Sequence, residues 1–110
     1  MQYKPIVQTV SETPIYLASV KAAKMTADEQ IAVIDYIAAN PLSGDLIVRG
    51  KGLRKIQIAG KGKGKSGGYR VIYYYWNENQ PIELYFAFAK NQMANLSDAQ
   101  LRRLVSALEE

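Results

Sequence analysis

The segment YRVIYYYWNENQPIELYFAFA, residues 69–89, decides the fold of this chain. β-branched and aromatic residues fill residues 69–76 and 82–89, and the polar residues and proline between them favour a turn. A third run of the same kind, residues 53–59, precedes a glycine-rich stretch. We therefore expect three strands that follow one another in an antiparallel meander.

Two helices are predicted before the meander, because residues that cap helix N-termini occur there. Thr13 followed by Pro14 is typical of an N-cap and a first helical position, and this helix is expected to extend to about residue 23. Thr26 and Glu29 have the T-x-x-E spacing of a capping box, in which each side chain binds the backbone N–H of the other residue. The second helix is therefore expected to begin at Ala27.

The remaining elements lie at the two ends of the chain. Residues 6–10 are a candidate for a short strand, and Asn40-Pro41 ends the second helix because the residue before a proline avoids helical angles. Ser97 and Gln100 have the spacing of another capping box, which predicts a last helix. Its apolar stripe consists of Leu101, Leu104, Val105 and Leu108.

The predicted order is therefore β-α-α-β-β-β-α. This order indicates an α+β fold, with an antiparallel sheet packed by helices on one of its faces. With 110 residues, 48% of them hydrophobic, the chain can bury a core of its own. We expect a single domain over residues 1–110.

Composition excludes several classes of protein. The chain has no cysteine and no histidine, which removes disulfide frameworks, thiolate chemistry and Ser-His or Cys-His hydrolases, and leaves no expected metal site or cofactor. No apolar stretch approaches the roughly 20 residues that span a bilayer, and the N-terminus lacks the pattern of a signal peptide. The sequence predicts a cytoplasmic protein without a membrane partner.

Positive charge is concentrated in one segment. Residues 49–70 contain no acidic residue, although the chain has 10 in all. The segment holds eight cations: Arg49, Lys51, Arg54, Lys55, Lys61, Lys63, Lys65 and Arg70. A field segregated in this way attracts polyanions to one surface, so we favour phosphate binding over a merely solvated basic hairpin.

The glycine-rich stretch GKGKGKSGGYR, residues 60–70, resembles a nucleotide-binding P-loop only superficially. The window that ends in Gly64-Lys65-Ser66 begins with Ala59, where that motif needs glycine. A P-loop must also lead into a helix whose N-terminal amides hold the phosphates, and here a predicted strand follows. We therefore exclude nucleotide binding by this loop.

The three loop lysines, Lys61, Lys63 and Lys65, are spaced two residues apart and point the same way if the loop is extended. Like charges at short distance lower one another's pKa, so one of these lysines is a candidate for a general base. A loop that only clamps a nucleic-acid backbone is the alternative, and the spacing alone does not decide between the two.

Four more cations lie near the ends of the predicted strands. Arg54 and Lys55 open the first strand of the meander, Arg70 begins the second and Lys90 follows the third. The planar fork of an arginine suits two phosphate oxygens, although a snorkelling side chain is the alternative for Arg70. We expect these charges to gather around a cleft. For each nearby tyrosine, packing in the core is the simpler interpretation, and any tyrosine that is left exposed could stack on bases.

The chain resembles the RelE-type toxins of bacterial toxin–antitoxin systems, most closely their HigB-like branch. The resemblance spans roughly residues 20–105, and the run GKSGGYRVIYY is its most specific part. The residues that carry it are Asn40-Pro41, Ser43-Gly44-Asp45, residues 50–55, residues 64–74, Ala89-Lys90-Asn91 and Asn95-Leu96-Ser97.

This resemblance implies a RelE-like α+β toxin that binds in the ribosomal A site and cleaves mRNA. The ribose 2′-hydroxyl attacks the neighbouring phosphate without a metal and leaves a 2′,3′-cyclic phosphate. Carried over by position, the catalytic residues are Lys65, Arg70 and Lys90. The resemblance implies that Arg70 would stabilise the transition state and that Lys90 would protonate the leaving oxygen. The RNA-binding residues are Arg54, Lys55, Lys61, Lys63 and Tyr73.

The sequence departs from relatives at one aromatic position and leaves alternatives open. Phe88 stands where relatives often have tyrosine, and no tyrosine follows Tyr85, so stacking on mRNA would fall to Tyr73 or Tyr75. A ParE-like inhibitor of DNA gyrase shares the fold, and a non-catalytic RNA-binding module shares the charge. In the leading interpretation a cognate antitoxin masks the basic cleft with an acidic segment or blocks access to the ribosome.

Overall fold

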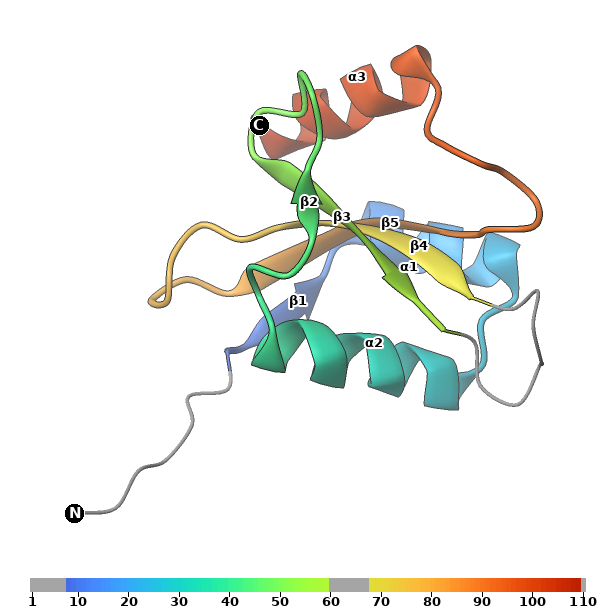
Figure 1. The fold of residues 1–110 in the computed structure, drawn as a ribbon, viewed down its shortest axis with the longest axis horizontal. Coiled ribbons are helices and arrows are strands. Elements are labelled where there is room, and N and C mark those ends of the chain that lie inside the picture. The colour runs from blue at the N-terminus through green and yellow to red at the C-terminus, as the bar shows by residue number, and fades with distance from the viewer. Residues whose placement is uncertain (1–7, 60–67, 110) are drawn as a thin grey trace.

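The computed structural model describes residues 8–59 and 68–109. Three helices and one five-stranded sheet make up this part of the chain (Figure 1). In chain order the elements are β1 (Val10–Glu12), α1 (Pro14–Ala23), α2 (Ala27–Ala39), β2 (Asp45–Leu46), β3 (Leu53–Ile58), β4 (Tyr69–Tyr74), β5 (Ile82–Ala89) and α3 (Asp98–Leu108). The predicted α+β class is confirmed, and the sequence analysis missed only the two-residue strand β2.

The sheet has the strand order β1-β5-β4-β3-β2. The predicted meander forms its centre, because β3 pairs with β4 and β4 with β5, both antiparallel. β1 pairs with β5 in parallel, so the sheet is mixed rather than wholly antiparallel. This strand begins at Val10, where the predicted strand was expected to end; residues 6 and 7 lie outside the described part of the chain.

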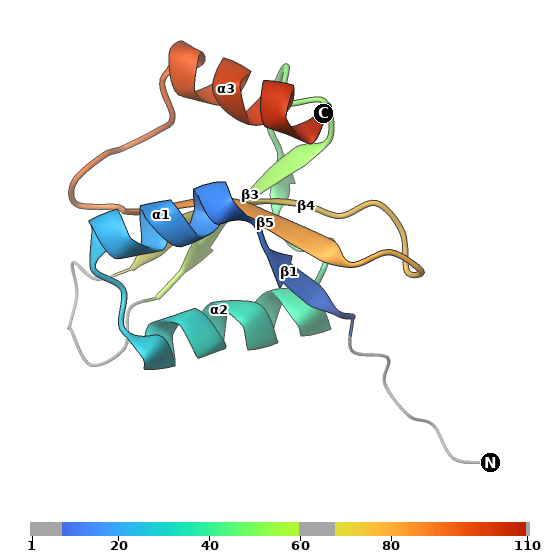
Figure 2. The ribbon, with the colours of Figure 1, turned by 180° about the vertical axis from the view of Figure 1, so that it is seen from behind.

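Helices cover both faces of the sheet, so the expectation that they pack on one face is wrong. α2 and α3 lie on opposite sides of the strands in both views (Figures 1 and 2). Alternation along β4 explains this, since Val71 and Tyr73 belong to a core cluster with α1 and α2, and Ile72 belongs to a second cluster with Leu104 of α3. A strand that is apolar on both faces needs a cover on each.

A β-bulge in β5 sets which residues face which helix. Ile72 pairs with Phe86, but the next residue, Tyr73, pairs with Leu84, so Tyr85 is an extra residue in β5. Leu84 packs in the cluster between the sheet and helices α1 and α2, whereas Phe86 packs against the cluster between the sheet and α3. Even-numbered side chains of β5 therefore change face at the bulge.

All three predicted helix starts are confirmed. The Thr13 hydroxyl accepts a hydrogen bond from the Tyr16 backbone N–H at 3.2 Å. Thr26 with Glu29 and Ser97 with Gln100 form complete capping boxes, with N···O distances of 2.8 to 3.1 Å. These caps fix where α2 and α3 begin, and α3 in turn borders the cavity described below.

The Tyr73 side chain ties the loop before β2 to the core. Its ring is fully buried, and its hydroxyl donates to the Pro41 carbonyl and accepts from the Gly44 N–H, both at 2.9 Å. A Cβ on Gly44 would lie 2.7 Å from the Tyr73 oxygen and 2.9 Å from the Lys55 carbonyl oxygen, so only glycine fits.

We predict that Tyr73→Phe lowers the free energy of unfolding by about 1 to 3 kcal/mol, because the Gly44 N–H and the Pro41 carbonyl lose their buried partner. Urea denaturation followed by circular dichroism measures the change. Tyr75→Phe is the matched control, since the Tyr75 hydroxyl makes no hydrogen bond to another described residue. Equal stability of the two variants would show that the hydroxyl does not hold the loop.

Stability should also fall in alkaline solution. Burial raises the pKa of the Tyr16, Tyr69, Tyr73 and Tyr85 hydroxyls, for Tyr85 from 10.0 to about 12. Between these values the unfolded chain loses protons that the folded protein retains, so stability declines as the pH rises from about 10 to 12. Tyr85→Phe should make the decline shallower in denaturant titrations across this range. A decline of unchanged steepness would contradict the prediction.

Candidate functional site

A cavity of about 220 Å³ lies on the α3 side of the sheet, between the turn that joins β2 to β3 and the N-terminus of α3. We call it the Arg70 cavity. The residues that line it and matter below are Arg49, Lys55, Arg70, Phe88, Asp98 and Leu101. Of the four cations expected around a cleft at the strand ends, Lys55 and Arg70 line this cavity, and helix α3 forms one of its walls.

Strand register brings Arg70 and Lys55 into this cavity. Arg70 pairs with Gln57 of β3 on one side and with Phe88 of β5 on the other, and Lys55 pairs with Ile72 two positions further along. Alternation places all of these side chains on the face of Ile72, which is the α3 face. The structure thus unites two of the predicted site residues from neighbouring strands.

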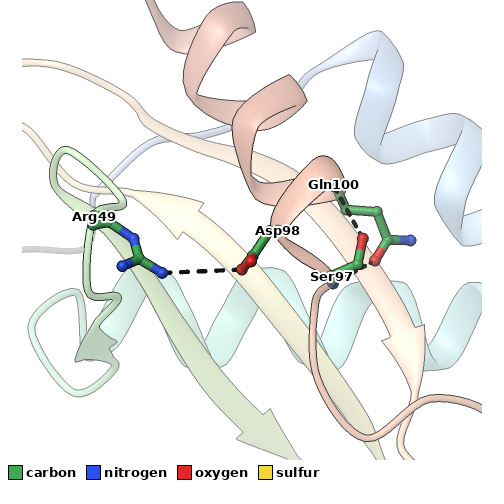
Figure 3. A network of polar contacts seen from close by, with 4 residues as sticks. All are labelled: Arg49, Ser97, Asp98 and Gln100. Carbon is green, nitrogen blue, oxygen red and sulfur yellow. Dashed lines mark hydrogen bonds and ion pairs between the residues drawn. The ribbon is translucent and has the colours of Figure 1, made fainter.

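The Arg70 guanidinium carries one nitrogen that is left without a hydrogen bond in the described part of the chain. Its Nε is buried and has no hydrogen-bond partner among the described residues. A buried polar atom without a partner is costly, and a phosphate oxygen would satisfy it through a charge-assisted hydrogen bond. Of the described residues that line the cavity, only Asp98 is acidic, and its carboxylate lies 4.0 Å from an Arg49 guanidinium nitrogen (Figure 3).

Arg54 is not part of the cavity. Its pairing with Tyr73 and Leu46 places it on the opposite face of the sheet from Lys55. There its Nη1 donates to the Gly44 carbonyl oxygen at 2.8 Å. The described contacts of Arg54 therefore hold the loop that Tyr73 also holds.

The prediction that Tyr73 contacts RNA is wrong. Its side chain is 0% exposed and lies in the core cluster below α1 and α2, so no base reaches its ring. Tyr75, the other tyrosine considered for stacking, packs partly against the same cluster. The physical reason is parity, because odd-numbered residues of β4 from Val71 onward face the helices α1 and α2.

The remaining predicted catalytic residues lie near Arg70 or outside the described residues. Lys90 follows β5, is exposed, and its backbone N–H donates to the Gly68 carbonyl oxygen at 3.2 Å. This contact places Lys90 beside the start of β4, but Lys90 does not line the cavity. The predicted sites at Lys61, Lys63 and Lys65 fall on residues that the structure does not describe.

The start of β4 is fixed by a buried carboxylate. Glu29 is 5% exposed, and its Oε1 accepts hydrogen bonds from the Thr26 N–H at 2.8 Å and from the Tyr69 hydroxyl at 3.0 Å. The bond from Tyr69 links α2 to the residue that precedes Arg70. Glu29 therefore helps to hold the strand from which Arg70 reaches the cavity.

Sequence reasoning missed Asp98 and did not single out Arg49. Asp98 is the first residue of α3, directly after the N-cap Ser97, where an acidic residue is expected for helix capping alone. Arg49 and Lys51 occupy left-handed backbone positions, with φ of 62° and 55°, in the stretch RGKG. Within the described ranges, no group of three or more His, Cys, Asp or Glu residues could hold a metal ion. Nor does any described helix have the length and apolarity to cross a membrane.

A small α+β domain with a cationic cavity at the ends of its central strands fits the toxins of toxin–antitoxin systems. The family model described as "RelE toxin of RelE / RelB toxin-antitoxin system" matches residues 15–108. The chain belongs to this RelE toxin family, and membership implies a cognate antitoxin of the RelB type. The match is to the family as a whole, so the HigB-like branch stays a prediction.

We predict that Arg70→Ala abolishes growth inhibition on induction without lowering the melting temperature, because it removes an unpaired buried nitrogen rather than a structural contact. Arg70→Lys should restore inhibition only in part, since an ammonium cannot reproduce the planar fork. Thermal denaturation and growth curves of induced cells measure the two effects.

Arg54→Ala is the matched control. It removes the 2.8 Å bond to the Gly44 carbonyl oxygen and should lower stability by on the order of 1 kcal/mol. An Arg70→Ala protein that melts well below the Arg54→Ala protein would identify Arg70 as a structural residue.

Proposed function

We propose that this toxin is a ribosome-dependent mRNA endonuclease, an mRNA interferase that acts in the ribosomal A site. The observation that carries the proposal is the Arg70 guanidinium, whose Nε is buried without a partner among the described residues, beside Lys55 in one cavity. Such a pair suits a phosphodiester, and membership of the RelE family supports RNA as its source. This activity would place the protein in the cytoplasm with ribosomes.

The reaction needs no water and no metal. The 2′-hydroxyl oxygen of a ribose forms a bond to the adjacent phosphorus, the bond from phosphorus to the 5′-oxygen of the next nucleotide breaks, and a 2′,3′-cyclic phosphate remains. One proton leaves the 2′-hydroxyl and one is delivered to the 5′-oxygen, so the charge balances. A general base and a general acid accelerate these two transfers.

The roles follow from where the cations lie. Arg70 would bind the non-bridging phosphate oxygens, whose negative charge grows in the transition state, and Lys55 would hold a neighbouring phosphate. Lys65 is our candidate for the base. Lys90, beside the start of β4, is our candidate for the acid that protonates the leaving 5′-oxygen.

The antitoxin would silence this activity by covering the same surface. An acidic antitoxin segment would be attracted to the cationic cavity and would exclude the phosphates of RNA from it. Co-expression of the antitoxin should then relieve toxicity while both proteins stay folded.

The proposal predicts breaks within codons of translated mRNA shortly after induction, detected by primer extension. The products should end in 2′,3′-cyclic phosphate and 5′-hydroxyl groups, because the 2′-hydroxyl is the nucleophile. An mRNA with a single 2′-deoxy substitution at the cleaved nucleotide should resist cleavage at that position in a translation extract. Loss of Arg70 should slow cleavage by about 100- to 1000-fold.

Two results would contradict the proposal. DNA damage without mRNA breaks would indicate a gyrase inhibitor. RNA binding that falls steeply with salt, without any cleavage, would indicate a clamp that only binds RNA.

A further inference from the structure

A second, larger cavity adjoins the Arg70 cavity along α3. It has a volume of about 590 Å³ and lies between the β2–β3 turn and α3. We call it the α3 groove and define it by Lys51, Leu101, Arg102, Val105 and Glu109, together with the wall that it shares with the Arg70 cavity.

The wall between the two cavities is an exposed ion pair. Arg49 and Asp98 line both cavities, and so does Leu101. The Arg49 and Asp98 side chains are 78% and 81% exposed, and their charged atoms lie 4.0 Å apart, so the pair contributes little stability (Figure 3). A phosphate that offers Arg49 two oxygens would compete with Asp98 for it.

The turn that carries Arg49 contains two residues with positive φ and is closed by backbone hydrogen bonds. Arg49 and Lys51 both have positive φ, which side chains other than glycine and asparagine rarely adopt. Backbone hydrogen bonds from Gly50 N to Ile47 O at 2.9 Å and from Leu53 N to Gly50 O at 3.0 Å close the turn. Backbone strain is often found at functional positions, and here it occurs at two cations that line the groove.

The charge of the two cavities together favours a polyanion. Their cations are Arg49, Lys51, Lys55, Arg70 and Arg102, and their acids are Asp98 and Glu109. The floor of the α3 groove includes the apolar side chains of Leu101 and Val105, against which ribose and base faces can pack. Both features suit single-stranded RNA better than an isolated phosphate.

We propose that the α3 groove is a second RNA subsite. It would bind the strand that continues from the phosphate held by Arg70, with Arg49, Lys51 and Arg102 contacting successive phosphates. Asp98 holds Arg49 in the free protein and gives it up when RNA spans both cavities. This subsite rests on the proposed function for the identity of its ligand.

The test measures binding of non-cleavable 2′-O-methyl RNA to the full-length toxin by fluorescence anisotropy. A dinucleotide carries a single phosphodiester and can place it only in the Arg70 cavity, whereas an RNA of about 12 nucleotides also reaches the groove. The triple variant Arg49→Ala, Lys51→Ala, Arg102→Ala removes the groove cations. Arg103→Ala is the matched control, because Arg103 neighbours Arg102 on α3 but lines a different cavity.

We expect the triple variant to bind the long RNA about 10-fold or more weakly and the dinucleotide as wild type does. Its salt dependence, the slope of log K against log salt, should fall by about 2, at about 0.7 per lost single-strand phosphate contact. Asp98→Asn should strengthen binding of the long RNA by about 2- to 5-fold, because it frees Arg49. A purely structural role of the ion pair would not raise affinity.

Other outcomes overturn the inference. The inference fails if the triple variant binds the long RNA as tightly as wild type does, or if Arg103→Ala loses as much affinity as the triple variant. It also fails if wild type does not bind the long RNA. Loss of antitoxin binding with intact RNA binding would identify the groove as a protein docking surface instead. A groove-dependent affinity in a toxin that makes no mRNA breaks would sustain the subsite while contradicting the proposed nuclease.

Discussion

The architecture depends on burial of β4 on both of its faces. Val71, Ile72 and Tyr73 are each at most 1% exposed, although they point alternately to opposite sides of the sheet. Such a strand is stable only between two layers, and α1 with α2 supplies one layer and α3 the other. The two clusters lie on opposite faces of β4, and α1 contacts both, through Tyr16 and Val20 on one side and Ile15 on the other.

The same constraint creates the site. Arg70 continues the face of Ile72, but it lies at the end of the strand where the apolar cover of α3 gives way to the N-terminus of that helix. The side chain is therefore held among apolar neighbours such as Phe88 while its charge faces a cavity. Cores of this size spare little free energy for an unpaired buried nitrogen, and the binding role proposed for Arg70 would account for that cost.

Local sequence signals were sufficient to predict most helices and strands. The contacts between elements could not be predicted from such signals. Capping residues predicted where α2 and α3 begin, and the run of β-branched and aromatic residues predicted the bounds of β5. Both signals depend on neighbours a few residues away. β2 has two residues, too few to show alternation. The opposite orientations of Arg54 and Lys55 and the burial of Tyr73 follow from sheet parity and helix placement, and the joining of Arg49 to Asp98 links segments far apart in the chain.

The bulge at Tyr85 bears on how this protein can evolve. Because the extra residue sends Ile82 and Leu84 to one layer and Phe86 to the other, the identity of each apolar side chain in β5 is open to exchange for another of similar size. Loss or gain of one residue there would turn a whole half of the strand inside out. Apolar substitutions of similar volume in β5 should therefore be tolerated better than an insertion or deletion at the bulge.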